Sequence, residues 1–388
     1  MKLEERLIIN SLNDSEFDLE EGLLIASGLD SEEKIGEYKG KLDLIHERGK
    51  SFIDMHQRQV PEDYVSLERA KLLFQYLYVG KPSRYNGNFL FTDVLDAQLS
   101  DGDCAVGNCT GLTSLYTVLA LREGLDVGIK LMPGHVKNLL FLNGLEIEVE
   151  NTNPDGFGKI GLDYEKLKNP NYLIHLIYDS RKDLLKNVTS LLFESEHNAD
   201  DERFALDILL HKGYYLAVSS LGEKVSDDLK KHRSFTETMA LANAGQGKVV
   251  EAFNFYKEFD ERVDEGNICN NYGRTSWWPR TCREIDGLGD YQNGYDEIKL
   301  FTDSTDYKVA KSLVEAGEIG MAEDVILRAC RREILSEHDI TSEQLADDVK
   351  KYFSFEGFRQ KLDTYRIDVD RERNAREAEL KQILSGSR

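Results

Sequence analysis

The sequence predicts an α+β protein, in which one helix and a small antiparallel sheet are flanked along the chain by helical regions. Three observations support this fold class. Apolar residues recur three and four positions apart in the first eighty residues, and helical patterns return after about residue 180. Between these regions lie short runs typical of strands. We therefore expect an N-terminal helical region (1–80), a core (81–182) and a C-terminal helical region (183–388).

The composition excludes several classes of protein. Of 388 residues, 49 are lysine or arginine and 71 are aspartate or glutamate, so the formal net charge is −22. A chain this acidic repels phosphate backbones, and no nucleic-acid partner is expected. No stretch reaches the roughly 18–20 uncharged apolar residues of a membrane span, and the first residues lack the layout of a signal peptide. Five scattered cysteines favour a reducing compartment, so we predict a cytoplasmic protein with no membrane partner.

In the N-terminal region, glycine and serine mark where helices end and begin. Gly28 interrupts a leucine-rich segment, and Ser31 is suited to cap the helix that follows, with Glu33 in its first turn. A further helix is expected from about Ser66, because apolar residues continue at helical spacing. These residues are packing signals and carry no chemistry.

The core region holds a helix followed by strands. The helix is expected from Cys109 to about Glu123, with its apolar residues on one buried face. Asn143-Gly144 is a strong signal for a two-residue hairpin, since both residues tolerate positive φ. The run after this turn alternates strictly between apolar and acidic residues, as a strand with two different faces does. The four strand-like runs are residues 127–132, 136–142, 145–149 and 172–178.

Two segments of the C-terminal region resemble each other. Gly247 and Gly317 each precede an alanine by five residues, at Ala252 and Ala322, and the two glycines stand 70 positions apart. This pattern is similar to the turn and second helix of tetratricopeptide repeats, whose period is about 34 residues. Generic antiparallel helical hairpins are the alternative interpretation.

The residues that carry chemistry begin with Cys109. This cysteine is expected in the first turn of its helix, with Asn108 available as the cap. Unpaired amide N–H groups and the positive end of the helix dipole stabilise a thiolate there. The same N–H groups can hold the oxyanion of a tetrahedral intermediate. Cys109 is therefore a candidate nucleophile.

His135 and Glu150 are the candidates for a base and for the group that orients it. His135 begins one predicted strand, and Glu150 ends the next. With Asn143-Gly144 as the turn, His135 faces about Thr152, and Glu150 lies one diagonal step away, within reach of a long side chain. Bulges are common beside active sites, so Asn151 is a rival for the third position. A thiol, an imidazole and a carboxylate in this order are typical of nucleophilic catalysis.

These residues resemble the transglutaminase-like superfamily, which is related to the papain-like cysteine enzymes. The resemblance rests on a Gly-x-Cys that opens a helix, a Gly-Leu after that helix, a histidine on a strand, and an acidic residue followed by threonine. It covers roughly residues 80–160. The matching residues are Gly107-Asn108-Cys109, Gly124-Leu125, His135 and Glu150-Asn151-Thr152, with Asn88-Phe89-Leu90 and Asp93-Val94-Leu95 upstream.

The resemblance implies a thiol enzyme that attacks an amide or peptide bond of a protein or peptide and forms a thioester on Cys109. Water as the second acceptor would give hydrolysis, and an amine would give transfer. The chain is most similar to members with N-terminal helices and C-terminal tetratricopeptide repeats. It departs from the family in having Glu150 where aspartate is usual. Gln98 is a candidate second oxyanion donor only by residue type, and Asn108 and Asn151 are the other candidates for contacting the substrate or the oxyanion.

The sequence offers other candidate sites and a second possible function. Cys104 is a rival nucleophile, but it precedes the helix by more than a turn. Cys269 and Cys282 have no accompanying Cys-x-x-Cys or histidine pair, so neither a metal nor a cofactor is predicted. The glycine-rich residues 287–294 lack the ending of a nucleotide-binding loop and indicate a surface turn. The second hypothesis is an inactive scaffold whose C-terminal helices bind a protein partner, with basic segments favoured by the acidic charge.

Overall fold

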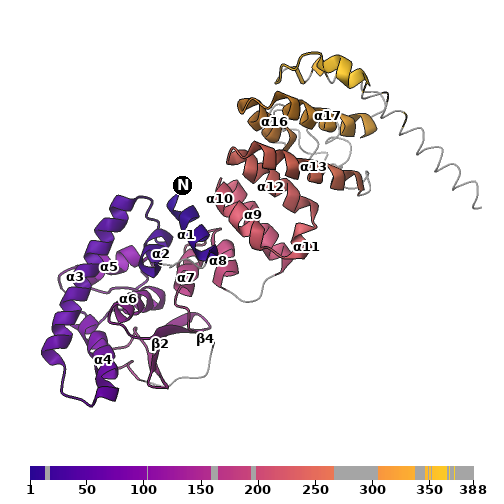
Figure 1. Ribbon diagram of the computed structural model, residues 1–388. Helices are drawn as coiled ribbons and strands as arrows, with labels where there is room; N and C mark the ends of the chain where they lie inside the picture. Colours follow the sequence, from indigo (N-terminus) through magenta and orange to yellow (C-terminus); the bar gives the residue numbers. More distant parts are fainter. Residues whose placement is uncertain are drawn as a thin grey trace, which may run out of the picture. The chain divides into compact units, whose positions relative to one another are not determined.

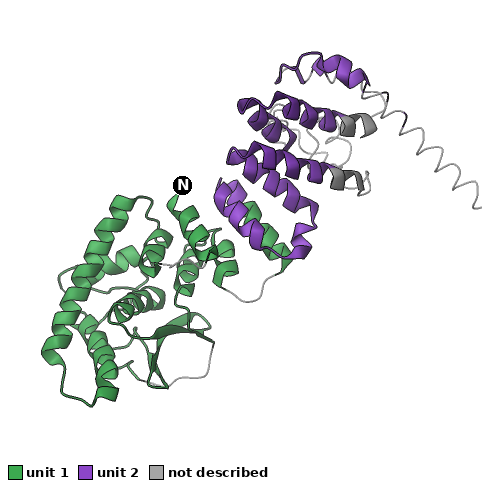
Figure 2. Ribbon diagram, in the orientation of Figure 1, with its two compact units in different colours: residues 1–208 green, residues 209–388 purple. Residues whose placement is uncertain are grey.

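The computed structural model describes residues 1–13, 18–102, 104–158, 165–193, 198–265, 305–336, 346–347, 349–350, 352–364, 367 and 371 (Figure 1). Its contacts divide the chain into two compact units, residues 1–208 and residues 209–388 (Figure 2). The fold is mixed α and β, mostly helical, with one four-stranded antiparallel sheet. The N-terminal helices and the predicted core both fall within the first unit.

The sheet lies in the first unit and has the strand order β3-β2-β1-β4. Its strands are β1 (Val127–Met132), β2 (His135–Leu142), β3 (Leu145–Val149) and β4 (Lys166–Leu167). The first three coincide with predicted runs, whereas β4 was not predicted. Asn143 (φ 50°) and Gly144 (φ 77°) both adopt positive φ, which confirms the two-residue turn. Asn138 pairs with Val149, so the predicted register of the hairpin is confirmed.

The fourth strand-like run is a helix, so that prediction was wrong. Residues Tyr172–Ser180 form α7. The buried side chains are Leu173, Ile174, Ile177 and Tyr178, a spacing that places all four on one helical face. A short apolar run fits a buried strand and a buried helix equally well, and here packing against α2 and α6 selects the helix.

The helix that begins at Cys109 is the centre of the first unit. α6 (Cys109–Arg122) packs on β1 and β2, and the neighbouring helices α2 (Leu19–Ala26), α4 (Val65–Tyr78), α5 (Phe91–Leu99) and α7 cover the rest of its surface. Every residue from Thr110 to Ala120 is buried, so the prediction of a single buried face was too narrow. The buried hydroxyl groups of the helix find hydrogen-bond partners close by. Ser114, for example, donates to the carbonyl of Thr110 at 2.9 Å.

The remaining helices of the first unit follow the sequence signals. Ser31 caps α3 (Glu32–His56) by accepting a hydrogen bond from the backbone N–H of Lys34, as predicted. The other elements are α1 (Leu3–Leu12), the 3₁₀ helix η1 (Glu62–Tyr64) and α8 (Lys186–Phe193), while α9 (Ala199–His211) crosses the boundary between the units. Within the described residues, no helix is both long enough and apolar enough to cross a membrane.

One face of the sheet buries charge. Glu148 of β3 binds Lys130 of β1 at 2.6 Å and also pairs with Lys137 of β2. The three side chains are only 2–6% exposed. The carboxylate therefore lies between the Nζ atoms of two buried lysines, and we call these three residues the Lys-Glu-Lys cluster.

The second unit contains helical hairpins. Its helices are α10 (Tyr215–Lys224), α11 (Asp227–Lys230), α12 (Arg233–Gly245), α13 (Val249–Glu265), α16 (Thr305–Glu315) and α17 (Ile319–Ser336). Gly247 (φ 74°) and Gly317 (φ 84°) form the turns of the hairpins α12–α13 and α16–α17. Ala252 and Ala322, five residues later, are both buried. Both interpretations of the sequence predicted hairpins at these places.

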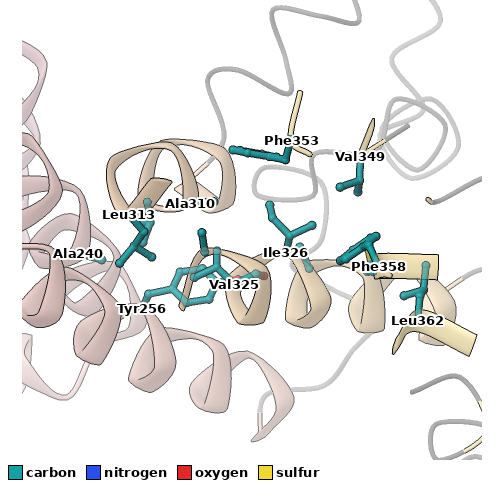
Figure 3. Packing of buried hydrophobic residues seen from close by; sticks show 14 of the residues in the cluster. Ala240, Tyr256, Ala310, Leu313, Val325, Ile326, Val349, Phe353, Phe358 and Leu362 are labelled. Atoms are coloured by element: carbon teal, nitrogen blue, oxygen red, sulfur yellow. The ribbon is translucent and has the colours of Figure 1, made fainter. Parts of the chain in front are cut away.

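The two hairpins are direct neighbours, although residues 266–304 separate them along the chain. The Tyr256 hydroxyl donates to the Asp306 carboxylate at 2.6 Å and lies 3.2 Å from the Val325 carbonyl oxygen. Figure 3 shows Leu313 and Val325 packing in one cluster with Tyr256 and Ala240. The two glycines that are 70 residues apart in the sequence therefore form the turns of two hairpins that pack against each other.

Candidate active site

Hydrogen bonds and close packing fix the backbone around Cys109 at the start of α6. The Asn108 side chain accepts a hydrogen bond from the backbone N–H of Gly111 at 3.0 Å, and the Asn108 backbone N–H donates to the Asn88 carbonyl at 2.6 Å. A Cβ atom at Gly111 would lie 2.6 Å from a methyl carbon of Val94. The absence of a side chain at Gly111 thus allows the segment around Asn88 and Val94 to pack against the first turn of α6.

His135 is the first residue of β2 and pairs with Glu150. Its Nε2 atom lies 2.6 Å from Oε2 of Glu150. The other carboxylate oxygen, Oε1, accepts hydrogen bonds from the backbone N–H of Thr152 at 3.1 Å and from its hydroxyl at 2.6 Å. The His135 ring lowers the pKa of the Cys109 thiol, and the thiol raises the pKa of the ring, so the two groups lie close enough to interact. Because Glu150 occupies Nε2, Nδ1 is the ring nitrogen left for the thiol.

The surroundings favour ionisation of this group of side chains, which we call the Cys109–His135–Glu150 triad. Burial raises the pKa of the Cys109 thiol, but the hydrogen bonds from His135 and from the backbone of Val136 and Thr110 outweigh burial, and the pKa is lowered. The hydrogen bond to Cys109, followed by that to Glu150, raises the pKa of His135 to about 9. Burial also opposes ionisation of Glu150, but its bonds to His135 and Thr152 lower its pKa. These shifts favour a thiolate, an imidazolium and a carboxylate in sequence.

A tight turn after β3 holds Glu150 in place. The Glu150 backbone N–H donates to the Gly156 carbonyl at 3.2 Å, and the Gly156 N–H donates to the Asn153 carbonyl at 2.9 Å. A Cβ atom at Gly156 would lie only 2.1 Å from the Glu150 carbonyl oxygen. Sequence reasoning missed Gly156, although Asn153-Pro154-Asp155-Gly156 has the composition of a turn and was a usable signal.

Asn151, the rival for the third position, turns away from His135. Its side-chain amide donates to the Asn138 side chain at 2.7 Å, and Asn138 donates in turn to the Thr117 hydroxyl of α6 at 2.7 Å. All three residues are buried. Asn151 therefore joins the end of β3 to the helix that carries Cys109, and Glu150 is the residue that contacts His135.

The structure gives Gln98 and Asn108 other partners. Gln98, on α5, accepts a hydrogen bond from Nη2 of the buried Arg84 at 3.1 Å, and its amide nitrogen lies 3.5 Å from the Leu77 carbonyl. The Asn108 side chain is occupied by its capping bond. In the described part of the chain, the hydrogen bonds of both side chains therefore go to groups other than the Cys109 thiol. The oxyanion donors that the geometry offers are backbone N–H groups of the first turn of α6, which no helical carbonyl accepts.

No group of three or more His, Cys, Asp or Glu side chains among the described residues could hold a metal ion. Cys269, Cys282 and the glycine-rich residues 287–294 lie outside the described residues. In comparisons with known proteins, no family model matched the sequence, and neither a curated protein nor a solved structure matched it significantly.

The charge of His135 can be tested with two alkylating reagents. We expect the rate of Cys109 with anionic iodoacetate, relative to neutral iodoacetamide, to fall about fivefold as the pH rises through about 9. Below that pH the imidazolium attracts the anion, and two unit charges about 4 Å apart in water attract by about 1 kcal/mol. Above it the ring is neutral. Mass spectrometry of the Cys109 peptide gives both rates. His135→Gln should abolish the step, and an equal step in that variant would contradict the assignment.

Proposed function

We propose that this protein is a transglutaminase-like thiol enzyme that acts on an amide or peptide bond of a protein or peptide. The observation that carries the proposal is the hydrogen bond between Nε2 of His135 and Glu150 at 2.6 Å, on a ring that also lowers the pKa of the Cys109 thiol. A nucleophile, a base and an orienting acid are the parts that acyl transfer through a thiol requires.

Each group has a defined task in this reaction. The Cys109 thiolate attacks the carbonyl carbon, and backbone N–H groups at the start of α6 stabilise the oxyanion. His135 then gives its proton to the departing nitrogen, so ammonia or an amine leaves and a thioester remains. In the second half, His135 removes a proton from water or from an amine, which attacks the thioester and releases Cys109. Glu150 keeps the ring oriented and stabilises its cation throughout.

The order of motifs supports the transglutaminase-like part of the proposal. The Gly-x-Cys segment opens α6, His135 begins β2, and Glu150-Asn151-Thr152 follows β3. The upstream segments around Asn88 and Val94, which the resemblance also includes, pack on the helix start. A helix docked on an antiparallel hairpin thus carries the three side chains.

An activated ester tests acyl transfer without knowledge of the natural substrate. We expect p-nitrophenyl acetate to give a burst of one nitrophenolate per chain, followed by slow deacylation, with an acetyl group on Cys109 found by mass spectrometry. The acetyl group on the Cys109 peptide should be absent in Cys109→Ala, and Cys104→Ala is the matched control that should retain both the burst and the acetylated Cys109. A primary amine that accelerates the second phase would indicate transfer. A burst of wild-type size in the double variant Cys104→Ala, Cys109→Ala would overturn the proposal.

The second candidate function is a protein-binding scaffold without catalysis. The adjacent hairpins α12–α13 and α16–α17 favour it, because stacked helical hairpins commonly present binding surfaces. The net charge of −22 would select basic partner segments. This candidate takes precedence if wild-type protein shows neither a burst nor an acetylated Cys109.

A further inference from the structure

A second thiol lies in a polar cluster outside the triad. Sγ of Cys104 is 2.9 Å from Nζ of Lys81 and 2.7 Å from the Ser100 hydroxyl. Lys81 also donates to the backbone carbonyls of Ser100 at 2.8 Å and Gly102 at 2.7 Å. The cluster is therefore assembled from the segment after α4, the end of α5 and the loop that leads to α6.

The burial of Lys81 bears on the charge of Cys104. Lys81 is only 4% exposed, and a buried ammonium group is costly without a counter-charge. Its hydrogen-bond partners in the described chain are carbonyl oxygens, a hydroxyl and the sulfur, and of these only the thiol ionises. The neighbouring Asp101 is exposed. The cluster thus favours a thiolate at Cys104 as the partner of the lysine.

A neutral thiol is the alternative form of Cys104. The sulfur lies 3.4 Å from the Ala97 carbonyl, to which a thiol could donate. The contact with Lys81 is shorter and requires an acceptor sulfur, because an ammonium group only donates; the Ser100 hydroxyl, which also donates to the Ala97 carbonyl at 2.8 Å, fits either form of the thiol. The hydrogen bond from Lys81, followed by that from Ser100, lowers the pKa of the thiol.

We propose that Cys104 and Lys81 form an oxidation site, at which a hydroperoxide converts the Cys104 thiolate to a sulfenic acid. Cys104 is partly exposed, which a small oxidant requires. A thiolate that is accessible and stabilised by an adjacent cation is typical of oxidant-sensitive cysteines. This site is distinct from Cys109 and does not depend on acyl transfer.

The oxidation needs only the Cys104 thiolate, Lys81 and the peroxide. The thiolate attacks one peroxide oxygen, a sulfur–oxygen bond forms, and the oxygen–oxygen bond breaks. Lys81 gives a proton to the departing hydroxide, which leaves as water, and Lys81 then recovers a proton from the solvent. Sulfur loses two electrons, and the peroxide gains them.

Cys104 lies in the same loop that leads to Cys109, five residues before it. The residues between Cys104 and Cys109 are hydrogen-bonded to an upstream segment. The Asn86 side chain donates to the Ala105 carbonyl at 3.0 Å, and the Val106 N–H donates to the Arg84 carbonyl at 2.7 Å. Oxidation removes the thiolate that compensates the buried Lys81. The change would therefore occur in the loop that leads directly into α6.

Rates at Cys104 in the full chain test the proposal. At pH 7 and limiting hydrogen peroxide, with dimedone to trap sulfenic acid, we expect labelling of the Cys104 peptide about tenfold faster in wild type than in Lys81→Met. An ordinary thiol is about 3% ionised at pH 7, and the lower nucleophilicity of a stabilised thiolate offsets part of the gain from full ionisation. Lys81→Arg, which keeps the charge, should stay close to wild type. Equal rates in wild type and a folded Lys81→Met would overturn the proposal.

Wild-type protein provides a second measurement if Lys81→Met does not fold. From pH 6 to pH 8, the alkylation rate of an ordinary thiol rises roughly 75-fold with its ionised fraction. We expect a much shallower rise for Cys104 with iodoacetamide. A full 75-fold rise would show a neutral thiol and overturn the proposal. Both readouts are masses of the Cys104 peptide, so they are independent of the outcome at Cys109.

Discussion

Glu150→Gln is expected to reduce acyl transfer by about 10³- to 10⁴-fold, because it favours the wrong tautomer of His135. Two donors of Thr152 hold Oε1 of residue 150, so the oxygen of the glutamine amide is expected to stay beside Thr152. The amide nitrogen would then face Nε2 of His135 and require that atom to accept a hydrogen bond. The ring proton would move to Nδ1, which could no longer take the thiol proton.

The rate constant for acylation of Cys109 by p-nitrophenyl acetate measures this effect. Nitrogen NMR of the imidazole should show the proton on Nδ1 in the variant, and the pKa of His135 should fall from about 9 toward its ordinary value as the negative charge is lost. Glu146→Gln, on the strand β3 that immediately precedes Glu150, is the matched control and should acylate at the wild-type rate. Unchanged kinetics in Glu150→Gln would exclude a role for the carboxylate.

Glu148→Gln is expected to have the largest effect on stability, about 3–5 kcal/mol. Lys130 and Lys137 both depend on this carboxylate, and removal of its charge leaves two buried ammonium groups without compensation. Burial opposes ionisation of Glu148, but the two lysines outweigh it and lower its pKa. A carboxylate with a lowered pKa stabilises the fold above its unfolded pKa, and this stabilisation is lost as the pH falls through the folded value.

Hydrogen exchange of the β2 and β3 amides can measure the loss, since it reports local stability within a chain of two units. Glu146→Gln again serves as the control: its pair with Lys166 is exposed, and such pairs contribute about 0.2–1 kcal/mol. Lys137→Met in the Glu148→Gln background should recover part of the loss, because it removes one of the two uncompensated charges. If the β2 and β3 amides exchange at the same rates in Glu148→Gln as in Glu146→Gln, the prediction is wrong and the Lys-Glu-Lys cluster does not contribute measurably to stability.

Local sequence signals predicted much of the candidate site. The helix beginning at Cys109, the turn at Asn143-Gly144 and the register of β2 with β3 all agree with the structure. These features depend on residues close together in the sequence, because capping, turn conformation and alternation are local properties. The register alone placed His135 within reach of Glu150.

Features decided by distant contacts escaped prediction. Residues 172–178 were predicted as a strand, because a short apolar run does not distinguish the two structures. Gln98 has Arg84 as its partner, and Asn151 bonds to Asn138 inside the fold. No local pattern contains these pairings, since each depends on which buried polar group needs a partner.

The sequence by itself determined where the helices and hairpin begin, and so which residues could supply a thiol, an imidazole and an acid. Tertiary structure alone decided that Glu150 rather than Asn151 contacts His135, that α6 is buried on every side, and that Lys81 lies against Cys104. The physical reason is that backbone conformation follows from near neighbours, whereas burial and charge pairing depend on which remote segments exclude water from a side chain.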